Sequence, residues 1–593
     1  ITGGTQAGSN LFHSFGEFSV PNGGTAFFNN ATDIQNIISR VTGGSVSNID
    51  GLIRANGAAN LFLINPSGII FGQNSQLNIG GSFVGTTANA LQFGNRGFFS
   101  ATEKNIPSPL LTINPSALLF NQINQNATIQ NSSVTFAGTD PAGFNAFGLR
   151  VGDGKSLLLM GGNVSIDGGK LNAYGGRVEL GGLAAAGTVG LNMDGNNLSL
   201  SFPEGVERTD VSFTNAARLD VAAGDGGNIA IYGQNLNIAG GSELVGGIRP
   251  SLGSVDSQAG DITLNVTGAI KVDASSIWDS VYNTSGNSGS IRINAESLFL
   301  SNGSYLESGT FGKGNAGSVF VQASGSVSLV NSYIYSTVET GAVGAGGDIN
   351  IAAGSLSLNN GAQLLTFVRG TSDLPAGRGD AGNVNIDVRD AVTIDGVNNG
   401  RVSAVYTYVD NGAIGNAGDI NITAGSLSLN NGAKLDASIY GKGNAGSVFV
   451  QASDSVSLTN SNILSAVGTE AEGLGGDINI KTKTLSLTDS QLIASTLGRG
   501  KAGSVFVQAS DSVSLINSII GSTVQYEAVG NGGEININAG ALSLSDGASL
   551  FASTYGQGNA GNILVQASGR VSLANNSYIS SGVAKEVVGS NGG

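Results

Sequence analysis

Cysteine is absent from this sequence, and only one histidine and 9 prolines occur among its 593 residues. Without cysteine the chain has neither disulfides nor a thiol nucleophile, and a single histidine, His13, almost excludes a histidine-dependent triad. Zinc is disfavoured for the same reason, because Cys and His are its usual ligands. A chain free of cysteine suits either the cytosol or export in an unfolded state, and the composition does not choose between them.

Charged residues are also scarce. They make up 11% of the chain, against about a quarter in an average protein, and the formal net charge is −15. The sequence has no cluster of Lys and Arg, so nucleic acid is excluded as a partner. No apolar run reaches the roughly 18 residues of a membrane-spanning helix. Apolar residues still account for 40% of the chain, which is enough to build a core.

Glycine, in contrast, is abundant at 94 residues, and a short phrase that begins with glycine recurs. The last six copies begin 27 to 30 residues apart. A fixed period of this size predicts a stack of repeated coils, in which each coil buries its apolar face against its neighbours. The phrase opens units at Gly227, Gly260, Gly289, Gly317, Gly347, Gly382, Gly418, Gly446, Gly476, Gly503, Gly533 and Gly561.

Within each unit, apolar and polar residues alternate in three short segments, which predicts three short strands. In the unit from Gly418 the apolar pairs are Ile420 and Ile422, Leu427 and Leu429, and Leu435 and Ala437. Aligned units carry apolar residues at the same positions, as stacked parallel strands about 4.8 Å apart require. We therefore predict an all-β parallel β-helix, a solenoid with three short strands per coil.

A polar column follows the second strand of each unit. It contains Asn431, Asn460, Asp489, Asn517, Asp546 and Asn575. Asn and Asp tolerate the left-handed conformation of tight turns, so the column predicts a corner of the coil rather than a metal site. The loops before the next glycine phrase alternate between basic (Gly441 to Ala445) and acidic (Thr469 to Gly473). They form either a binding strip or a charge-balanced edge, and we favour the edge.

Residues 1 to about 215 lack the clean period, but two phrases stand out there. They are Ile64-Asn-Pro-Ser-Gly-Ile-Ile-Phe and Ile113-Asn-Pro-Ser-Ala-Leu-Leu-Phe. Proline fixes φ and asparagine starts turns, so each phrase predicts a tight bend between two strands.

These phrases, with Gly8-Ser-Asn-Leu-Phe-His-Ser-Phe and Asn36-Ile-Ile-Ser-Arg-Val, resemble the secretion domain of two-partner secretion exoproteins. These are the filamentous-haemagglutinin-like proteins, and this version is most similar to cyanobacterial forms. The resemblance covers roughly residues 1 to 200. It implies a right-handed β-helix, export through the periplasm, and recognition by the periplasmic modules of an outer-membrane β-barrel transporter.

By the same resemblance, the secretion motif residues are Asn65, Pro66, Ser67, Gly68, Asn114, Pro115 and Leu118. Ser67 and Ser116 replace an asparagine of the usual motif, and Ala117 stands before the leucine of the second one. We therefore expect residues 1–215 to form the secretion domain, an irregular β-helix with a cap. Residues 216–593 would form a shaft of coils about 30 residues long. The last residues look like the opening of another coil, so the chain is expected to be part of a longer protein.

Catalysis receives little support from the sequence. Asp454 and Asp511 recur at equivalent positions and could serve glycoside hydrolysis, but they are better explained as turn residues. We therefore predict that the chain is not an enzyme and has no cofactor or metal site; the calcium-binding nonapeptide of repetitive toxins is missing. Arg378, Gly379 and Asp380 form the tripeptide that integrins read, in an inserted loop that we expect to be exposed.

The predicted function is that of a secreted adhesin or matrix rod at the outer cell surface. It would bind glycans or a host or neighbouring cell surface through many weak contacts. Two alternatives remain open: self-association into a structural filament or sheath, and a glycan-degrading β-helix enzyme.

Overall fold

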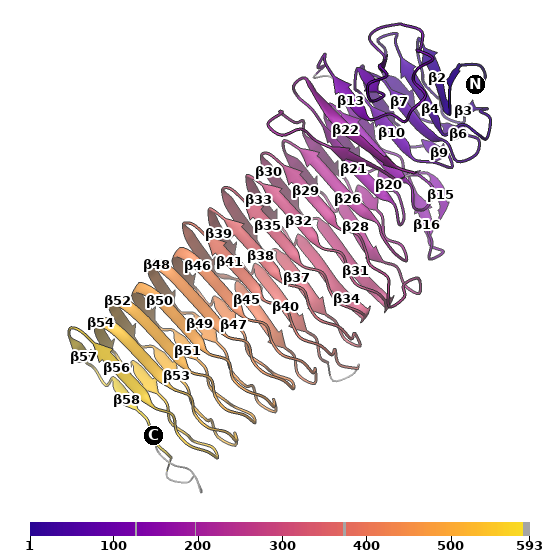
Figure 1. The fold of residues 1–593 in the computed structure, drawn as a ribbon. Helices are drawn as coiled ribbons and strands as arrows, with labels where there is room; N and C mark the ends of the chain where they lie inside the picture. Colours follow the sequence, from indigo (N-terminus) through magenta and orange to yellow (C-terminus); the bar gives the residue numbers. More distant parts are fainter. Residues whose placement is uncertain (125–126, 196, 372–374, 585–593) are drawn as a thin grey trace. The chain divides into compact units, whose positions relative to one another are not determined.

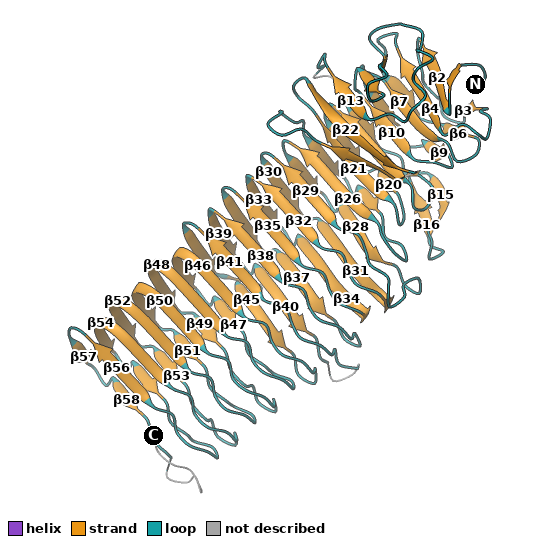
Figure 2. Ribbon diagram, viewed as in Figure 1, coloured by secondary structure: helices purple, strands orange, loops and turns teal. Residues whose placement is uncertain are grey.

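The computed structural model describes residues 1–124, 127–195, 197–371 and 375–584. Its two compact units are an N-terminal unit (Ile1–Asp279 with Arg292–Glu296) and a C-terminal unit (Ser280–Ile291 with Ser297–Gly593). Figure 2 shows strands joined by loops, and the described part of the chain contains no helix. No described segment therefore forms a helix that could cross a membrane.

The N-terminal unit stacks its strands in parallel columns. The first column contains β2 (Asn10–Phe15), β4 (Asn36–Val41), β7 (Asn60–Ile64), β10 (Phe83–Thr86), β18 (Ser156–Gly161), β21 (Arg177–Gly182), β26 (Asn228–Gly233) and β29 (Ile262–Val266). The second contains β5 (Ser47–Ile49), β8 (Ile69–Phe71), β14 (Ile129–Asn131), β19 (Val164–Asp167), β24 (Val211–Thr214), β27 (Leu236–Ala239) and β30 (Ala269–Asp273). On the third side lie β3 (Thr25–Phe28), β6 (Leu52–Ala55) and β9 (Gln76–Asn78), and then β17 (Leu149–Arg150), β20 (Lys170–Asn172), β25 (Arg218–Asp220) and β28 (Glu243–Ile248).

Antiparallel elements interrupt this plan. A five-stranded sheet runs in the order β12 (Phe98–Ser100), β11 (Ala90–Gln92), β13 (Ala117–Phe120), β22 (Gly187–Asp194) and β23 (Asn197–Ser201). The pairs β1 (Thr5–Ala7) with β2 and β15 (Phe136–Thr139) with β16 (Asn145–Phe147) are also antiparallel. Buried side chains of this sheet and of the first column share one core, which includes Phe12, Phe62, Phe93, Phe99 and Leu118. The additional sheet therefore belongs to the core of the unit.

The C-terminal unit repeats one coil with little change, and Figure 1 shows its strands following one another from β34 to β58. The first column contains β35 (Val319–Ala323), β38 (Ile349–Ala353), β41 (Val384–Val388), β46 (Ile420–Asn430), β48 (Val448–Thr459), β50 (Ile478–Thr488), β52 (Val505–Ile516), β54 (Ile535–Ser545) and β56 (Ile563–Ala567). The second contains β33 (Ser297–Ser301), β36 (Ser326–Val330), β39 (Ser355–Asn359), β42 (Ala391–Asp395) and β57 (Val571–Leu573).

The third column of this unit contains β34 (Tyr305–Lys313), β37 (Tyr333–Val338), β40 (Gln363–Val368), β45 (Ala404–Val409), β47 (Lys434–Asp436), β49 (Asn462–Leu464), β51 (Gln491–Ile493), β53 (Ile519–Gly521), β55 (Ser549–Phe551) and β58 (Tyr578–Ser580). A small hairpin, β43 (Val397–Asn398) with β44 (Arg401–Val402), is inserted after β42. Two further strands, β31 (Ser276–Ser285) and β32 (Ile291–Ala295), carry residues of both units. The predicted all-β parallel β-helix is confirmed.

Stacking explains the recurring glycine. A Cβ built on Gly446 would lie 1.8 Å from the backbone oxygen of Gly418, and one on Gly503 would lie 1.8 Å from that of Gly476. No side chain fits at this distance, so the corner accepts only glycine. The residues that follow the glycine, such as Ile420, Val448 and Ile478, stack in register and are fully buried.

The predicted Asn and Asp corner is confirmed, because Asn431, Asn460, Asp489 and Asn517 all have φ between 45° and 53°. Their side chains also connect neighbouring coils: Asn517 Nδ2 donates to Asp489 Oδ1 at 2.6 Å. Such left-handed residues are costly unless they are glycine, Asn or Asp, which explains the composition of the column.

The prediction of three separate strands holds only for part of the stack. In β46, β48, β50, β52 and β54 the first two strands merge into one strand of 11 or 12 residues. The predicted turn at Asp454 and Asp511 is therefore wrong: each lies inside a continuous strand, where the pairing register shifts as in a β-bulge. A bulge bends a strand without ending it, so the sequence pattern resembles that of a turn.

Candidate functional site

The first Asn-Pro motif forms the expected bend between β7 and β8. Asn65 is 1% exposed, and its Nδ2 donates to the carbonyl of Ser45 at 3.0 Å and to Ser47 Oγ at 2.9 Å. Its Oδ1 accepts from the backbone N–H of Ser67, while the N–H of Gly68 donates to the Asn65 carbonyl. Gly68 has φ of +117°, and a Cβ there would lie 3.0 Å from the oxygen of Thr128. This motif is a buried structural turn.

The second motif differs from the prediction. Leu118 is fully buried in β13, and Pro115 is buried just before it. No strand precedes the motif, however, because β12 ends at Ser100 and the segment from there to Ser116 is irregular. The expected bend between two strands is therefore wrong here, and the motif instead leads an irregular segment into β13.

Asn114 of the second motif contacts a ladder of asparagines, which we call the asparagine ladder. Asn10, Asn36 and Asn60 are the first residues of β2, β4 and β7 and are stacked in register. Asn36 Nδ2 donates to Asn10 Oδ1 at 2.8 Å and to Asn114 Oδ1 at 3.0 Å, and Asn60 Nδ2 donates to Asn36 Oδ1 at 3.0 Å. All three ladder residues are at most 2% exposed, whereas Asn114 is exposed. The motif thus connects to the buried start of the first column.

Arg40 fixes the irregular segment from the other side. Its guanidinium donates to the carbonyls of Ser100, Glu103 and Asn105 at 2.5 to 3.1 Å and lies 4.3 Å from the centre of the Phe99 ring. It is 4% exposed, and burial lowers its pKa. The one histidine, His13, is buried beside Phe28 with ring centres 5.4 Å apart, and burial lowers its pKa. Neither side chain has the surroundings of a catalytic group.

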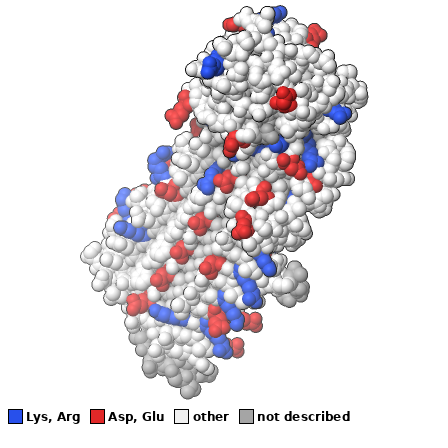
Figure 3. All heavy atoms as spheres, turned by 45° about the vertical axis from the view of Figure 1, so that its right-hand side comes forward, with Lys and Arg blue, Asp and Glu red and all other residues white. Residues whose placement is uncertain are grey.

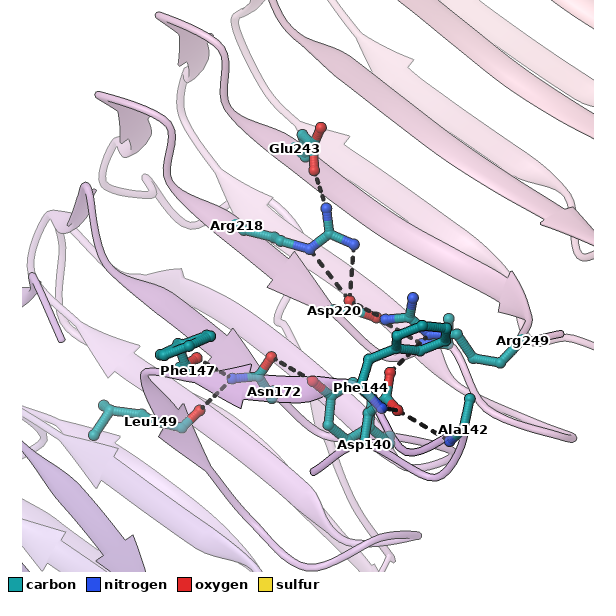
Figure 4. A network of polar contacts seen from close by, with 12 residues as sticks. Asp140, Ala142, Phe144, Phe147, Leu149, Asn172, Arg218, Asp220, Glu243 and Arg249 are labelled. Atoms are coloured by element: carbon teal, nitrogen blue, oxygen red, sulfur yellow. Dashed lines mark hydrogen bonds and ion pairs between the residues drawn. The ribbon is translucent and has the colours of Figure 1, made fainter. Parts of the chain in front are cut away.

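A second polar network joins the β15–β16 hairpin to residues of β25 and β28 (Figure 4). Asp220 Oδ2 accepts from Arg249 at 2.5 Å and from Arg218 at 3.0 Å, and Arg218 also binds Glu243. Asp140 of the hairpin adds an ion pair of 3.5 Å with Arg249. Each carboxylate of this network faces a guanidinium, so the network fixes the hairpin to the outer face of the third column.

The same hairpin exposes aromatic side chains. Phe136, Phe144 and Phe147 are 54%, 57% and 38% exposed. Below them Tyr174 is buried, donates to Asn172 Oδ1 at 3.0 Å, and has its pKa raised by burial and by Asp220. The sequence gives no periodic signal for this arrangement, because the hairpin is an insertion between β14 and β17.

The Arg378-Gly379-Asp380 tripeptide lies in a stacked corner of the C-terminal unit. Arg378 and Asp380 are exposed, as expected, and Arg378 pairs in parallel with Val343 on one side and Ile414 on the other. Asp380 Oδ1 accepts from the backbone N–H and side-chain amide of Asn416 at 2.7 and 2.9 Å. The inserted residues 372–374 lie outside the described residues. Integrin recognition stays a prediction, although the carboxylate that it would need is already hydrogen-bonded.

Sequence reasoning missed an acidic and aromatic cluster on the outer face of β34 and β37. Burial and the nearby Glu339 raise the pKa of Glu307 to about 7. Glu339 itself pairs with Arg369 at 2.8 Å, while the rings of Tyr333 and Tyr335 stack 5.5 Å apart in the same cluster. The recurrence of Tyr, Glu and Phe at outward positions of successive coils was the available signal.

Asp454 and Asp511, the carboxylates considered for catalysis, do not lie within a cluster of acidic side chains in the described part of the chain. Asp454 Oδ1 accepts from Lys483 Nζ at 3.0 Å, and no group of three or more His, Asp or Glu side chains there could hold a metal ion. The face drawn in Figure 3 is mostly uncharged, with charged side chains scattered over it singly and in small groups. Where charged loops do stack, they alternate as predicted, with Lys442 Nζ 3.6 Å from Glu472 Oε2.

Comparison with known proteins assigns the first part of the chain. Residues 1–231 match the family model of the TPS secretion domain. Among solved structures, the crystal structure of the HMW1 secretion domain from Haemophilus influenzae is 15% identical, with a TM-score of 0.37; the match covers 75% of this chain and 96% of that one. None of the curated proteins matches the chain in sequence. The assignment therefore depends on the family model.

Proposed function

We propose that this chain, a two-partner secretion exoprotein, acts after export as an adhesin or matrix rod that binds surfaces or glycans through many weak contacts. Exoproteins of this class pass through the periplasm to the cell surface or the extracellular space. The secretion domain implies a cognate outer-membrane TpsB transporter as partner.

The observation that supports adhesion is the constant chemistry of one outer face of the C-terminal unit. The middle outward position of the second strand segment is Ser or Thr in every coil from β36 to β57; Ser486 and Ser543 are exposed, and the others are partly exposed. These residues are Ser328, Ser357, Thr393, Ser428, Ser457, Ser486, Ser514, Ser543 and Ser572. Hydroxyls of neighbouring coils can hydrogen-bond to each other, as Ser357 Oγ does to Ser328 Oγ at 3.0 Å. Repeated identical weak sites sum by avidity.

The secretion motifs support export by fixing the fold of the secretion domain. In this proposal Asn65, Ser67 and Gly68 hold the bend between β7 and β8, while Asn114 and Pro115 deliver Leu118 into the core. The hydrogen bonds of Asn65 and the burial of Leu118 support this role. We propose no enzymatic activity, because Asp454 is paired with Lys483 and Asp511 accepts a hydrogen bond from the adjacent Ser510, so the two carboxylates that the sequence offered do not form a catalytic pair.

Adhesion can be tested with the full chain coupled to beads that are washed over glycan-coated and uncoated surfaces. A variant with Ser428→Glu, Ser457→Glu and Ser486→Glu places negative charge along the serine face. We expect at least a ten-fold loss of attached beads. The matched control carries the same charge at exposed loop positions, Asn411→Glu, Thr469→Glu and Gln557→Glu, and should attach like the unmodified chain. An unmodified chain that attaches to none of these surfaces would refute the adhesin role.

A further inference from the structure

A shallow groove of about 530 Å³ runs across the first halves of β46, β48, β50, β52 and β54, on the outer face of the C-terminal unit. Its floor consists of the outward side chains that follow each glycine phrase. In chain order these alternate between amides and rings: Asn421, Phe449, Asn479, Phe506 and Asn536. The strands pair in register, so each ring lies between two asparagines of neighbouring coils.

The asparagines of this column fall into two groups. At the first strand of the groove and in the two coils before it, Asn421 Nδ2 donates to Asn385 Oδ1 and Asn385 Nδ2 donates to Asn350 Oδ1, both at 2.9 Å. Further along the groove, Asn479 and Asn536 make no side-chain hydrogen bond to another described residue, because the neighbouring coils offer apolar side chains: Asn479 lies between Phe449 and Phe506, and Asn536 lies between Phe506 and Leu564. Both amides are half-exposed and face the groove. Phenylalanine therefore interrupts the amide ladder within the groove, and the asparagines there can bind a ligand instead of one another.

We infer that this groove binds an extended, uncharged polysaccharide strand, an assignment that rests on the proposed adhesive function and gives it a site. Phe449, 42% exposed, and Phe506 would stack against the apolar faces of sugar rings. The amides of Asn479 and Asn536 would exchange hydrogen bonds with the hydroxyls between them, since each amide both donates and accepts.

The spacing of the rings fits such a ligand. Phe449 and Phe506 are two coils apart, which at about 4.8 Å per coil gives about 10 Å. A disaccharide repeat of an extended glycan has a similar length, so alternate sugars would meet successive rings. The long side chains of Gln451 and Gln508 stand beside the rings and are exposed, and they can reach further hydroxyls.

Charge disfavours other ligands. Among the described residues that line the groove, Lys481 is the one charged side chain, so the groove offers neither the clustered cations that phosphate groups need nor acidic partners for a basic peptide. The groove also lacks a continuous apolar floor, because an asparagine follows every phenylalanine. A ligand with neutral hydroxyl groups and apolar ring faces matches the phenylalanine rings and asparagine amides that alternate in the groove.

The test is affinity electrophoresis of the full chain in native gels that contain hydroxyethyl cellulose, mixed-linkage β-glucan or dextran. We expect retardation by at least one glucan, and at least a ten-fold weaker affinity for the Phe449→Ala, Phe506→Ala double variant. Asn479→Leu with Asn536→Leu should weaken binding to a similar extent. The matched controls are Phe320→Ala and Asn385→Leu, at the same strand position outside the groove, and both should bind like the unmodified chain.

Two outcomes would overturn the inference: retardation unchanged in both double variants, or no retardation of the unmodified chain by any of the glucans. In the second case, beads that still attach to surfaces would leave the adhesive function intact and refute only the groove. Conversely, a chain that binds glucan through the groove but attaches to no surface would retain the groove and lose the proposed function.

Discussion

Both units stack parallel strands, but they use asparagine in opposite ways. In the N-terminal unit the asparagine ladder of Asn10, Asn36 and Asn60 is buried and reaches Asn114, far along the chain. In the C-terminal unit the ladder of Asn350, Asn385 and Asn421 faces outward and is half-exposed. An irregular unit depends on individual long-range hydrogen bonds, whereas a regular unit depends on a position that repeats.

The largest effect is expected where repetition is strictest, at the glycine corner. Gly446→Ala places a Cβ 1.8 Å from the oxygen of Gly418, so two coils must separate locally. We expect a loss of about 3–5 kcal/mol, in the range of severe overpacking. Hydrogen exchange of β46 and β48 in the full chain would measure it, since damage in a repeat array stays near its origin.

A glycine of the irregular unit supplies the control. Gly152→Ala meets no atom closer than 3.5 Å, so we expect a change below about 1 kcal/mol. Equal effects of the two substitutions would show that the corner tolerates a side chain, and would remove the physical reason for the repeat.

The second prediction compares the two asparagine ladders. Asn36→Ala removes the donor to Asn10 Oδ1 and the acceptor of Asn60 Nδ2, two buried polar atoms, which costs about 2–3 kcal/mol. Asn385→Ala removes equivalent bonds at a half-exposed position where water replaces them, so we expect less than about 1 kcal/mol. Urea unfolding of the full chain, with secretion measured in parallel, would separate them. Loss of secretion with Asn385→Ala but not with Asn36→Ala would contradict this account.

The sequence predicted best the structural features that recur in every stacked coil. The glycine corner, the ladder that contains Ile420 and Val448, and the left-handed Asn517 are local consequences of one coil that neighbours copy. It predicted poorly the features that depend on a single contact between residues far apart in the chain. Arg40 holds carbonyls 60 to 65 residues away, at the start of the irregular segment that stands where a strand was expected before Asn114.

Other features were outside the reach of pattern analysis. The bulge near Asp454 resembles a turn in its residues and differs only in the register of its neighbours. The groove with Phe449 and Asn479 required knowledge of which side chains lie beside each other in adjacent coils. In the candidate site, Asn65 and Leu118 were identified by resemblance, whereas the ladder that connects Asn36 to Asn114 was not. Its signal, an asparagine before three successive apolar phrases, is visible only in retrospect.

Carboxylates on the outer face of the third column provide another comparison. In the N-terminal unit Asp220 and Glu243 share Arg218, so their charge is balanced within the network (Figure 4). In the C-terminal unit Glu307 has Ser280 as hydrogen-bond donor and lies near the acidic Glu339, whose guanidinium partner is Arg369. The two units should therefore respond differently to pH.

The last prediction, with the smallest effect, is that the C-terminal unit loses stability as the pH rises from 5 to 8. The pKa of Glu307 is about 7 in the folded chain, above the ordinary glutamate value of 4.5. Its contribution is therefore fully present below about pH 4.5 and is lost as the pH passes 7. One pKa unit corresponds to about 1.4 kcal/mol, so with partial exposure we expect a loss of about 2 kcal/mol.

Glu307→Gln should remove most of this dependence on pH, because an amide does not titrate. Burial also raises the pKa values of Glu339 and Asp436, and these two carboxyls would account for the remainder. Hydrogen exchange of β34 against that of β25 at both pH values would measure the difference, and Glu534→Gln, at an exposed carboxylate of the same unit, should leave it unchanged. A β25 that loses as much protection as β34 would show that charge balance does not distinguish the two faces.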